Sequence, residues 1–282
     1  KETMDALGVA SIIGVLVETA FLFLYMIPAG LLKTDDISRA YQLLPNVLLV
    51  INYAIEKKKI LPWCFAAVGM IYILSMGTRG PVVVMLVFLF VKLIKWSSHR
   101  KGAKFLLLLT IAAIGMIYSN QTLYMGVLRT ISEVFRGFGF STRVIDHALN
   151  RTMITYMSER DIIYSTMLQK ITERPFIGYG VYGEWSWFGW NAHNMFLEIL
   201  VHFGIILGGA IIFWILRTVI KCYLETKNTY AKDIILIWGC LSFVRGIFGG
   251  SYLQIATFFL IGFCLAEKHR MRQMYRYSQE EL

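Results

Sequence analysis

The sequence predicts an all-α membrane protein that crosses the bilayer about eight times. Of its 282 residues, 57% are hydrophobic and only 16% are charged. This composition is too apolar for a soluble domain and is typical of a polytopic membrane protein. Apolar runs of membrane length also recur along the chain, and a spanning helix needs about 20 such residues, with a range of about 17–25.

Eight segments meet this length criterion. The second is the weakest, because it contains Pro45, Asn46 and Asn52. The first lacks a small-residue cleavage site and is followed by further spans, so we do not interpret it as a cleavable signal peptide. The predicted spans are 6–27, 40–56, 60–77, 80–96, 103–119, 194–216, 233–249 and 251–267.

These spans divide the chain into four regions. Residues 1–119 hold the first five spans, 120–193 form a long loop, 194–267 hold the last three spans, and 268–282 form a basic tail. The chain begins at Lys1, and we therefore expect it to be truncated at its N-terminus, with further spans missing.

The lysines predict the orientation, because short loops rich in Lys and Arg stay on the cytoplasmic side. Most lysines lie in segments that eight spans place on one side, namely 56–60, 92–104, 217–232 and 267–282. The outer side then receives 28–40, 78–80, 120–193 and the turn near Arg245. The net charge of +10 therefore indicates topology beside an anionic leaflet, and we expect no nucleic-acid partner.

The long outer loop contains two predicted helices. Apolar residues recur at helical spacing from Tyr124 to Phe138, which predicts a helix along the membrane surface. Ser158 resembles an N-cap, with an acid three residues later, and an apolar stripe follows from Ile163 to Ile171. Pro175 is expected to end that second helix near Glu173.

The outer loop is also biased toward arginine. It holds six arginines and one lysine, whereas the four cytoplasmic segments hold eleven lysines and five arginines. Arginine makes planar bidentate contacts with phosphate that lysine cannot make. Arg160 would lie in the first turn of the second helix, where free N–H groups favour an anion. A solvated or carboxylate-paired arginine is the simpler interpretation of any one of these residues.

Glycines, tryptophans and a histidine then precede the sixth span. Gly178, Gly180 and Gly183 permit tight turns, while Trp185, Trp187 and Trp190 fit either an interfacial aromatic belt or a platform for sugar rings. His193 begins the span, as a base or as a polar helix cap. Asn194 and Glu198 share one helix face, and a carboxylate at that depth usually marks a functional or paired position.

Three stretches resemble, in order, the motifs of the O-antigen ligase and polymerase superfamily. "MGTRGPVVVMLV" resembles its S-R-G turn, "SERDIIYSTMLQKITERPFIGYG" its S-G-R and R-P-x-x-G-x-G block, and "AHNMFLEILVHFGIILG" its H-N-x-x-L-E helix. Thr78 stands where the family has serine, and Glu159 where it has glycine, but both arginines are present.

This resemblance, over roughly residues 60–266, implies an integral-membrane glycosyltransferase of the GT-C-like kind. Such enzymes use a polyprenyl-diphosphate-linked glycan at the outer face of the bacterial cytoplasmic membrane. Polymerases add the glycan to another lipid-linked repeat unit, and ligases add it to lipid A–core. Other polysaccharide-assembly membrane proteins are possible partners. We favour a polymerase because polymerases occur more widely, and the sequence does not separate the two.

The expected chemistry assigns a role to each candidate residue. Arg79 and Arg160 would stabilise the charge that grows on the departing diphosphate, and His193 would remove the proton of the acceptor hydroxyl. The predicted substrate-binding residues are Arg174, Asn194, Glu198, Gly178, Gly180, Trp185 and Trp187.

We expect no metal or other cofactor in this chemistry. The sequence has no D-x-D motif, and Asp35-Asp36 is interpreted as a solvated pair. The four cysteines lack C-x-x-C spacing, so neither a disulfide framework nor a zinc site is expected. A transporter would need polar residues distributed through the spans, and a structural scaffold would leave the arginine bias unexplained.

Overall fold

The computed structural model describes residues 2–26, 28–29, 37–98, 121–150, 160–189 and 192–280. Every regular element within these residues is helical, which confirms the all-α prediction. The chain forms two compact units, Lys1–Tyr156 and Met157–Leu282, and each is described by itself. The boundary between the units falls inside the predicted outer loop.

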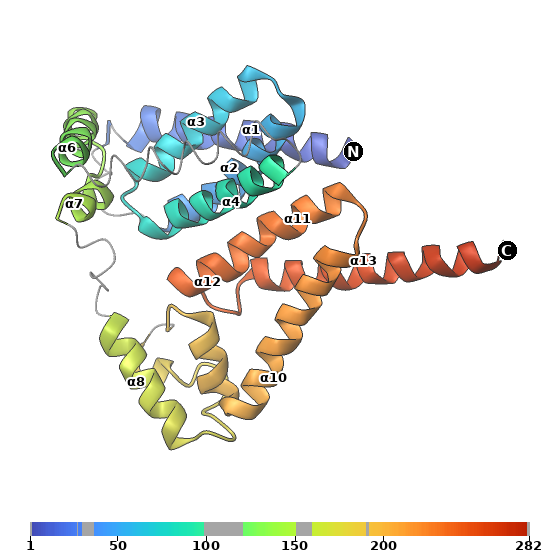
Figure 1. The fold of residues 1–282 in the computed structure, drawn as a ribbon. Coiled ribbons are helices and arrows are strands. Elements are labelled where there is room, and N and C mark those ends of the chain that lie inside the picture. The colour runs from blue at the N-terminus through green and yellow to red at the C-terminus, as the bar shows by residue number, and fades with distance from the viewer. Residues whose placement is uncertain are drawn as a thin grey trace. The chain divides into compact units, whose positions relative to one another are not determined.

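The first unit is built around one central helix. It contains α1 (Glu2–Phe21), the π-helix η1 (Leu22–Met26), α2 (Ile37–Lys57), α3 (Ile60–Ser75) and α4 (Arg79–Ser98). Figure 1 shows α1, α2 and α3 side by side. Leu44 and Leu48 of α2 are fully buried between its neighbours, and α2 continues through Pro45 without a break. Small residues let the helices approach closely, since Gly8 faces the Tyr53 ring.

The last two described helices of the first unit lie in the predicted outer loop. They are α6 (Gln121–Gly137) and α7 (Arg143–Leu149). The first of them confirms the helix predicted from Tyr124 onward. Its apolar residues Val127, Ile131 and Val134 are exposed, so the stripe is not used to pack against the described part of the protein. An exposed ion pair, Arg136 to Asp146 at 3.2 Å, links α6 to α7.

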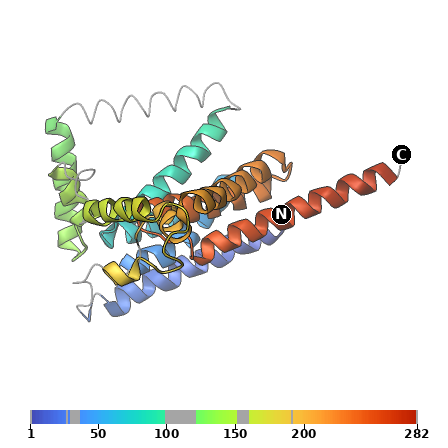
Figure 2. The same cartoon turned by 90° about the horizontal axis from the view of Figure 1, so that it is seen from below.

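The second unit surrounds a long helix, α10 (Met195–Glu225). Before it come α8 (Arg160–Glu173) and α9 (Trp185–Phe188), and after it α11 (Thr229–Gly239), the π-helix η3 (Cys240–Val244), α12 (Arg245–Phe248) and α13 (Ile255–Glu280). The N-terminal part of α10 packs against α8, and α10 also contacts α11 and α13. Figure 2 shows the C-terminal end of α13 projecting away from the rest of its unit.

Each predicted span overlaps helical structure, except 103–119, which lies outside the described residues, and the last helix begins at Ile255 rather than at residue 251. Two described helices, Glu2–Tyr25 and Met195–Glu225, are long and apolar enough to cross a membrane, and Ile60–Ser75 is a shorter apolar helix. The predicted span 233–249 is divided among α11, η3 and α12. The structure thus shows the helices, and the eight-span topology stays a prediction.

Candidate functional site

The N-terminal part of α10 is interrupted, and the preceding loop fills the interruption. At Gly204 the backbone leaves the helical region (φ 77, ψ 175). Tyr179 N donates to Val201 O at 2.8 Å, and Ile205 N donates to Pro175 O at 2.6 Å. The loop at 175–180 therefore satisfies backbone groups that a continuous helix would have paired internally, as buried backbone requires.

Two glycines make this docking possible. A Cβ on Gly178, where φ is 70, would lie 2.5 Å from the carbonyl oxygen of Val201. A Cβ on Gly204 would lie 2.6 Å from the backbone of Phe176. Both contacts are with backbone atoms, which cannot swing aside as a flexible side chain can. Gly178 of the R-P-x-x-G-x-G block and Gly204 of α10 thus form the two sides of one backbone contact.

We expect Gly178→Ala to destabilise the protein much more than Gly180→Ala. Both positions have positive φ, 70 and 81, so placing alanine in this left-handed conformation lowers the free energy of unfolding by about 1–3 kcal/mol in both variants. Only Gly178 adds a backbone clash, because nothing lies within 4 Å of a Cβ at Gly180. Thermal unfolding of the two purified variants in detergent measures the difference. Equal losses would show that the loop does not dock on α10 in this way.

His193 lies directly before α10, in a constrained backbone conformation. Its φ is 55, in the left-handed region, and its carbonyl oxygen accepts a 3.3 Å hydrogen bond from the Tyr164 hydroxyl. Burial lowers the pKa of His193 below its ordinary value, the Arg160 charge lowers it further, and a hydrogen bond with the Gly249 backbone opposes them. His193 is consequently neutral near pH 7, the form that accepts a proton.

Asn194, and not His193, caps the helix. The Asn194 side-chain oxygen accepts from Phe196 N at 3.1 Å and from Leu197 N at 3.2 Å, and its backbone is extended. This satisfies two of the free N–H groups at the start of α10. The structure therefore gives Asn194 a structural role and leaves the imidazole of His193 available for another one.

Arg160 reaches the same place from α8, of which it is the first described residue. Its Nη1 donates to Phe248 O at 2.8 Å, one residue before Gly249. The start of α8 is thereby joined to the end of α12, beside His193. The predicted cap Ser158 lies outside the described residues, while the apolar stripe is confirmed, since Met167 packs in a core cluster with Val201.

Arg174 and the tryptophans shape the loop that docks on α10. The guanidinium of Arg174 stacks on the Tyr179 ring at 4.7 Å, and Trp187 contacts that ring edge-on at 4.7 Å. Trp187 thus belongs to the packed loop. Trp185 is 49% exposed, and its ring contacts the Tyr182 ring edge-on at 5.6 Å. Trp190 lies outside the described residues.

Arg79 belongs to the first unit, where it is the first residue of α4. A turn with Gly77 at φ 66 precedes it, and Gly80 packs closely against Tyr41 of α2. Ser141 N donates to Ser75 O at 3.0 Å, so the chain after α6 lies beside this turn. Because each unit is described by itself, the shared site of Arg79 with Arg160 and His193 stays a prediction.

A buried polar cluster lies beside the part of α10 that precedes the break at Gly204. The carboxylate of Glu198 accepts from Ser251 Oγ at 2.7 Å and from Tyr252 N at 3.1 Å. The His202 ring contacts Glu184 through Nε2 and Tyr252 Oη through Nδ1 at 2.8 Å. Glu184, Glu198 and His202 are all buried.

The sequence interpretation missed Glu184, His202 and Tyr252. One signal was present, because His202 follows Glu198 by four residues and so extends the Asn194–Glu198 face by another turn. Glu184 gave no such signal, since it lies in a loop and meets His202 only through tertiary folding.

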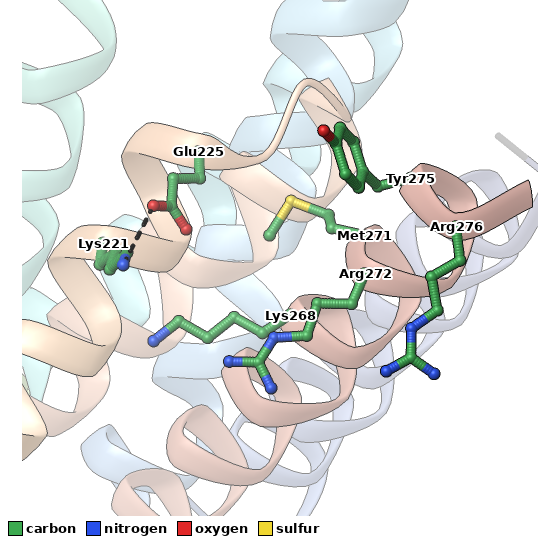
Figure 3. A pocket seen from close by; sticks show the side chains of 7 residues that line it. All are labelled: Lys221, Glu225, Lys268, Met271, Arg272, Tyr275 and Arg276. Carbon is green, nitrogen blue, oxygen red and sulfur yellow. Dashed lines mark ion pairs between the residues drawn. The ribbon is translucent and has the colours of Figure 1, made fainter. Parts of the chain in front are cut away.

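A second candidate site, a pocket of about 550 Å³, lies at the opposite end of α10 (Figure 3). From α13, Lys268, Arg272 and Arg276 line it at four-residue spacing, so they share one helix face. Lys221 and Glu225 of α10 form a 3.5 Å ion pair at its rim. The excess of positive charge suits an anionic group, and these residues lie in the predicted cytoplasmic segments.

No protein-family model, curated protein or solved structure matches this chain.

Proposed function

We propose that this chain is a membrane glycosyltransferase. It transfers a glycan from a polyprenyl-diphosphate carrier to an acceptor sugar hydroxyl, and polymerisation of surface-polysaccharide repeat units is the form we favour. The proposed location is the bacterial cytoplasmic membrane, with the site on the outer side. The proposal rests on the motif resemblance together with the arrangement of Arg160 and His193.

The surface of the apolar helices supports the membrane part of the proposal. Only 33% of the most apolar stretch of α10 is buried, and Ile206 and Phe213 are each 66% exposed. A core helix of a soluble protein would hide such side chains, whereas a helix that is apolar all round fits a lipid environment. The helix Glu2–Tyr25 is also largely exposed, since 22% of its most apolar stretch is buried.

One observation carries the catalytic part: a permanent cation and a neutral imidazole lie beside the same short backbone segment. Arg160 donates to Phe248 O, and His193 bonds with the Gly249 backbone. Departure of a polyprenyl diphosphate needs positive charge, and attack by a sugar hydroxyl needs a base. Burial lowers the pKa of His193 and the Arg160 charge lowers it further, so both favour the neutral form of the proposed base.

The proposed step balances without another reactant. The acceptor oxygen bonds to the anomeric carbon while the bond from that carbon to the phosphate oxygen breaks. His193 takes the hydroxyl proton, and the diphosphate leaves with the electron pair, facing Arg160 and, in the proposal, Arg79. Arg174 and Trp185 lie on the loop nearby and are the candidates for contact with sugars.

A transfer assay tests the function directly. Purified protein in lipid nanodiscs is incubated with a polyprenyl-diphosphate-linked repeat unit, and products are separated by gel electrophoresis. Chain extension supports a polymerase, and transfer only to added lipid A–core supports a ligase. The protein is also reconstituted into vesicles, where movement of the donor across the bilayer without a new glycosidic bond would indicate a transporter and refute the proposal.

The predicted topology has its own test, in which Asn150→Cys is labelled from outside intact cells and Lys58→Cys is not. The positive-inside rule places Lys58 in the cytoplasm and the loop 120–193 outside. The four native cysteines are replaced first, because Cys64 is exposed. An impermeant maleimide is the reagent, and permeabilised cells are the control. Labelling of Lys58→Cys alone would reverse the orientation.

A further inference from the structure

We propose that Glu184, Glu198 and His202 bind a divalent transition-metal ion, such as Zn²⁺ or Mn²⁺, beside the part of α10 that precedes the break at Gly204. One ligand atom from each residue lies within 4.8 Å of the others, and all three side chains are buried. Two carboxylates and an imidazole are ligands that suit these ions. The site is separate from the contacts of Arg160 and His193 with residues 248 and 249.

The charge of the cluster calls for a cation. A buried carboxylate is costly unless it is paired or bound to a metal. His202 balances at most one of the two carboxylates, even when it is protonated. Within the described part of the chain, Oε1 of Glu184 is buried and has no hydrogen-bond partner. That oxygen is free to act as a metal ligand, and its side chain is 0% exposed.

The surrounding contacts orient these groups as they are oriented around bound metals. A metal-binding histidine usually has its second ring nitrogen held by another group. Here Tyr252 Oη holds Nδ1 of His202 at 2.8 Å, which leaves Nε2 facing Glu184. The Ser251 hydroxyl and the Tyr252 N–H fix the Glu198 carboxylate. Each proposed ligand except Glu184 is therefore oriented by a neighbour.

The position of the site defines its role. Glu184 lies in the loop that docks on α10, Glu198 lies on the short part of α10 before the break, and His202 lies next to the break. A bound ion would fasten the loop to the interrupted helix, and it would take no part in the proposed transfer step. The expectation that no metal holds the diphosphate is unaffected.

Metal analysis of the purified, tag-free protein tests the site. We expect close to one equivalent of a transition metal per chain by inductively coupled plasma mass spectrometry. Removing it with a chelator should lower the melting temperature by on the order of 5 °C, and adding Zn²⁺ or Mn²⁺ should restore it. Protein that purifies without metal, and whose melting temperature neither ion raises, would overturn the proposal.

Variants separate a metal site from a hydrogen-bonded cluster. Glu184→Gln and His202→Gln keep polar side chains but bind metal poorly, and both should lose the metal and the ion-dependent rise in melting temperature. His269→Gln, at an exposed position on α13, is the matched control and should lose neither. If the Glu184 and His202 variants keep full metal content, the ion binds elsewhere and the site is refuted. The wild-type chelation result decides the question should either variant fail to fold.

Discussion

Arg160→Ala is expected to abolish glycan transfer while the protein still inserts and folds. The removed guanidinium is the cation next to His193, and loss of one group that stabilises transition-state charge typically costs about 10²–10³ in rate. The lost hydrogen bond to Phe248 O is exposed, so its effect on stability should be small. Arg160→Lys should recover little if the phosphate contact is bidentate.

Controls separate this effect from general loss of charge. Arg136→Ala removes an arginine from the same predicted outer loop, where it forms an exposed pair with Asp146, and it should retain activity. Arg79→Ala should resemble Arg160→Ala, since the proposal places both on the diphosphate. The measurement is the rate of polymer formation per unit of membrane-inserted protein. Full activity in Arg160→Ala would remove that residue from the site.

His193→Asn is the second substitution with a large expected effect, a loss of about 10²–10⁴ in turnover. Asparagine tolerates the positive φ of this position as well as histidine does, and Asn194 still caps α10. Folding and donor binding should therefore be unchanged, while the proton acceptor is lost. Turnover and donor affinity, measured separately, distinguish a base from a binding residue. An Asn variant with most of its activity would limit His193 to positioning.

The pH dependence follows from the lowered pKa of His193. Because the neutral imidazole is the active form, kcat/KM should be constant near pH 7 and should fall only below the ordinary histidine value of about 6.5. The stability of the folded state is expected to change with pH in the same direction as the rate. Between the two pKa values the unfolded chain binds more protons, so acidification through about pH 6.5 destabilises the folded state. A rate profile with its acid limb above pH 6.5 would contradict the assignment.

Much of the helical architecture was predictable from hydrophobic runs and start and stop signals. Arg160–Glu173 formed where the stripe and Pro175 indicated. The predicted span 233–249 matches one continuous helical run, 229–248, but the π-helical turn within that run was not predicted. Apolar content does not determine backbone geometry inside an apolar segment, so such interruptions are not readable from the run.

The candidate site was predictable only in part. Arg160 and His193 stood out as polar residues at helix starts, and the structure brings them beside neighbouring backbone carbonyls. The interaction of Gly178 with α10 was not readable, since it joins residues whose approach depends on the break at Gly204. Glu184 was missed for the same reason: its partner is set by how the loop docks.

In the proposed membrane topology, the break in α10 also sets the depth at which the docked loop would lie. In a bilayer whose cytoplasmic edge is near Arg217, Gly204 is about 20 Å above that edge, at 1.5 Å per residue. The hydrocarbon core is about 30 Å thick, so in this topology the loop tip would enter the outer leaflet. Phe176 and Ile177 at that tip are 71% and 86% exposed, as suits side chains among acyl tails. In the proposed function, this depth would let a lipid-tethered donor reach the docked loop from within the leaflet, without its carrier chain passing through water.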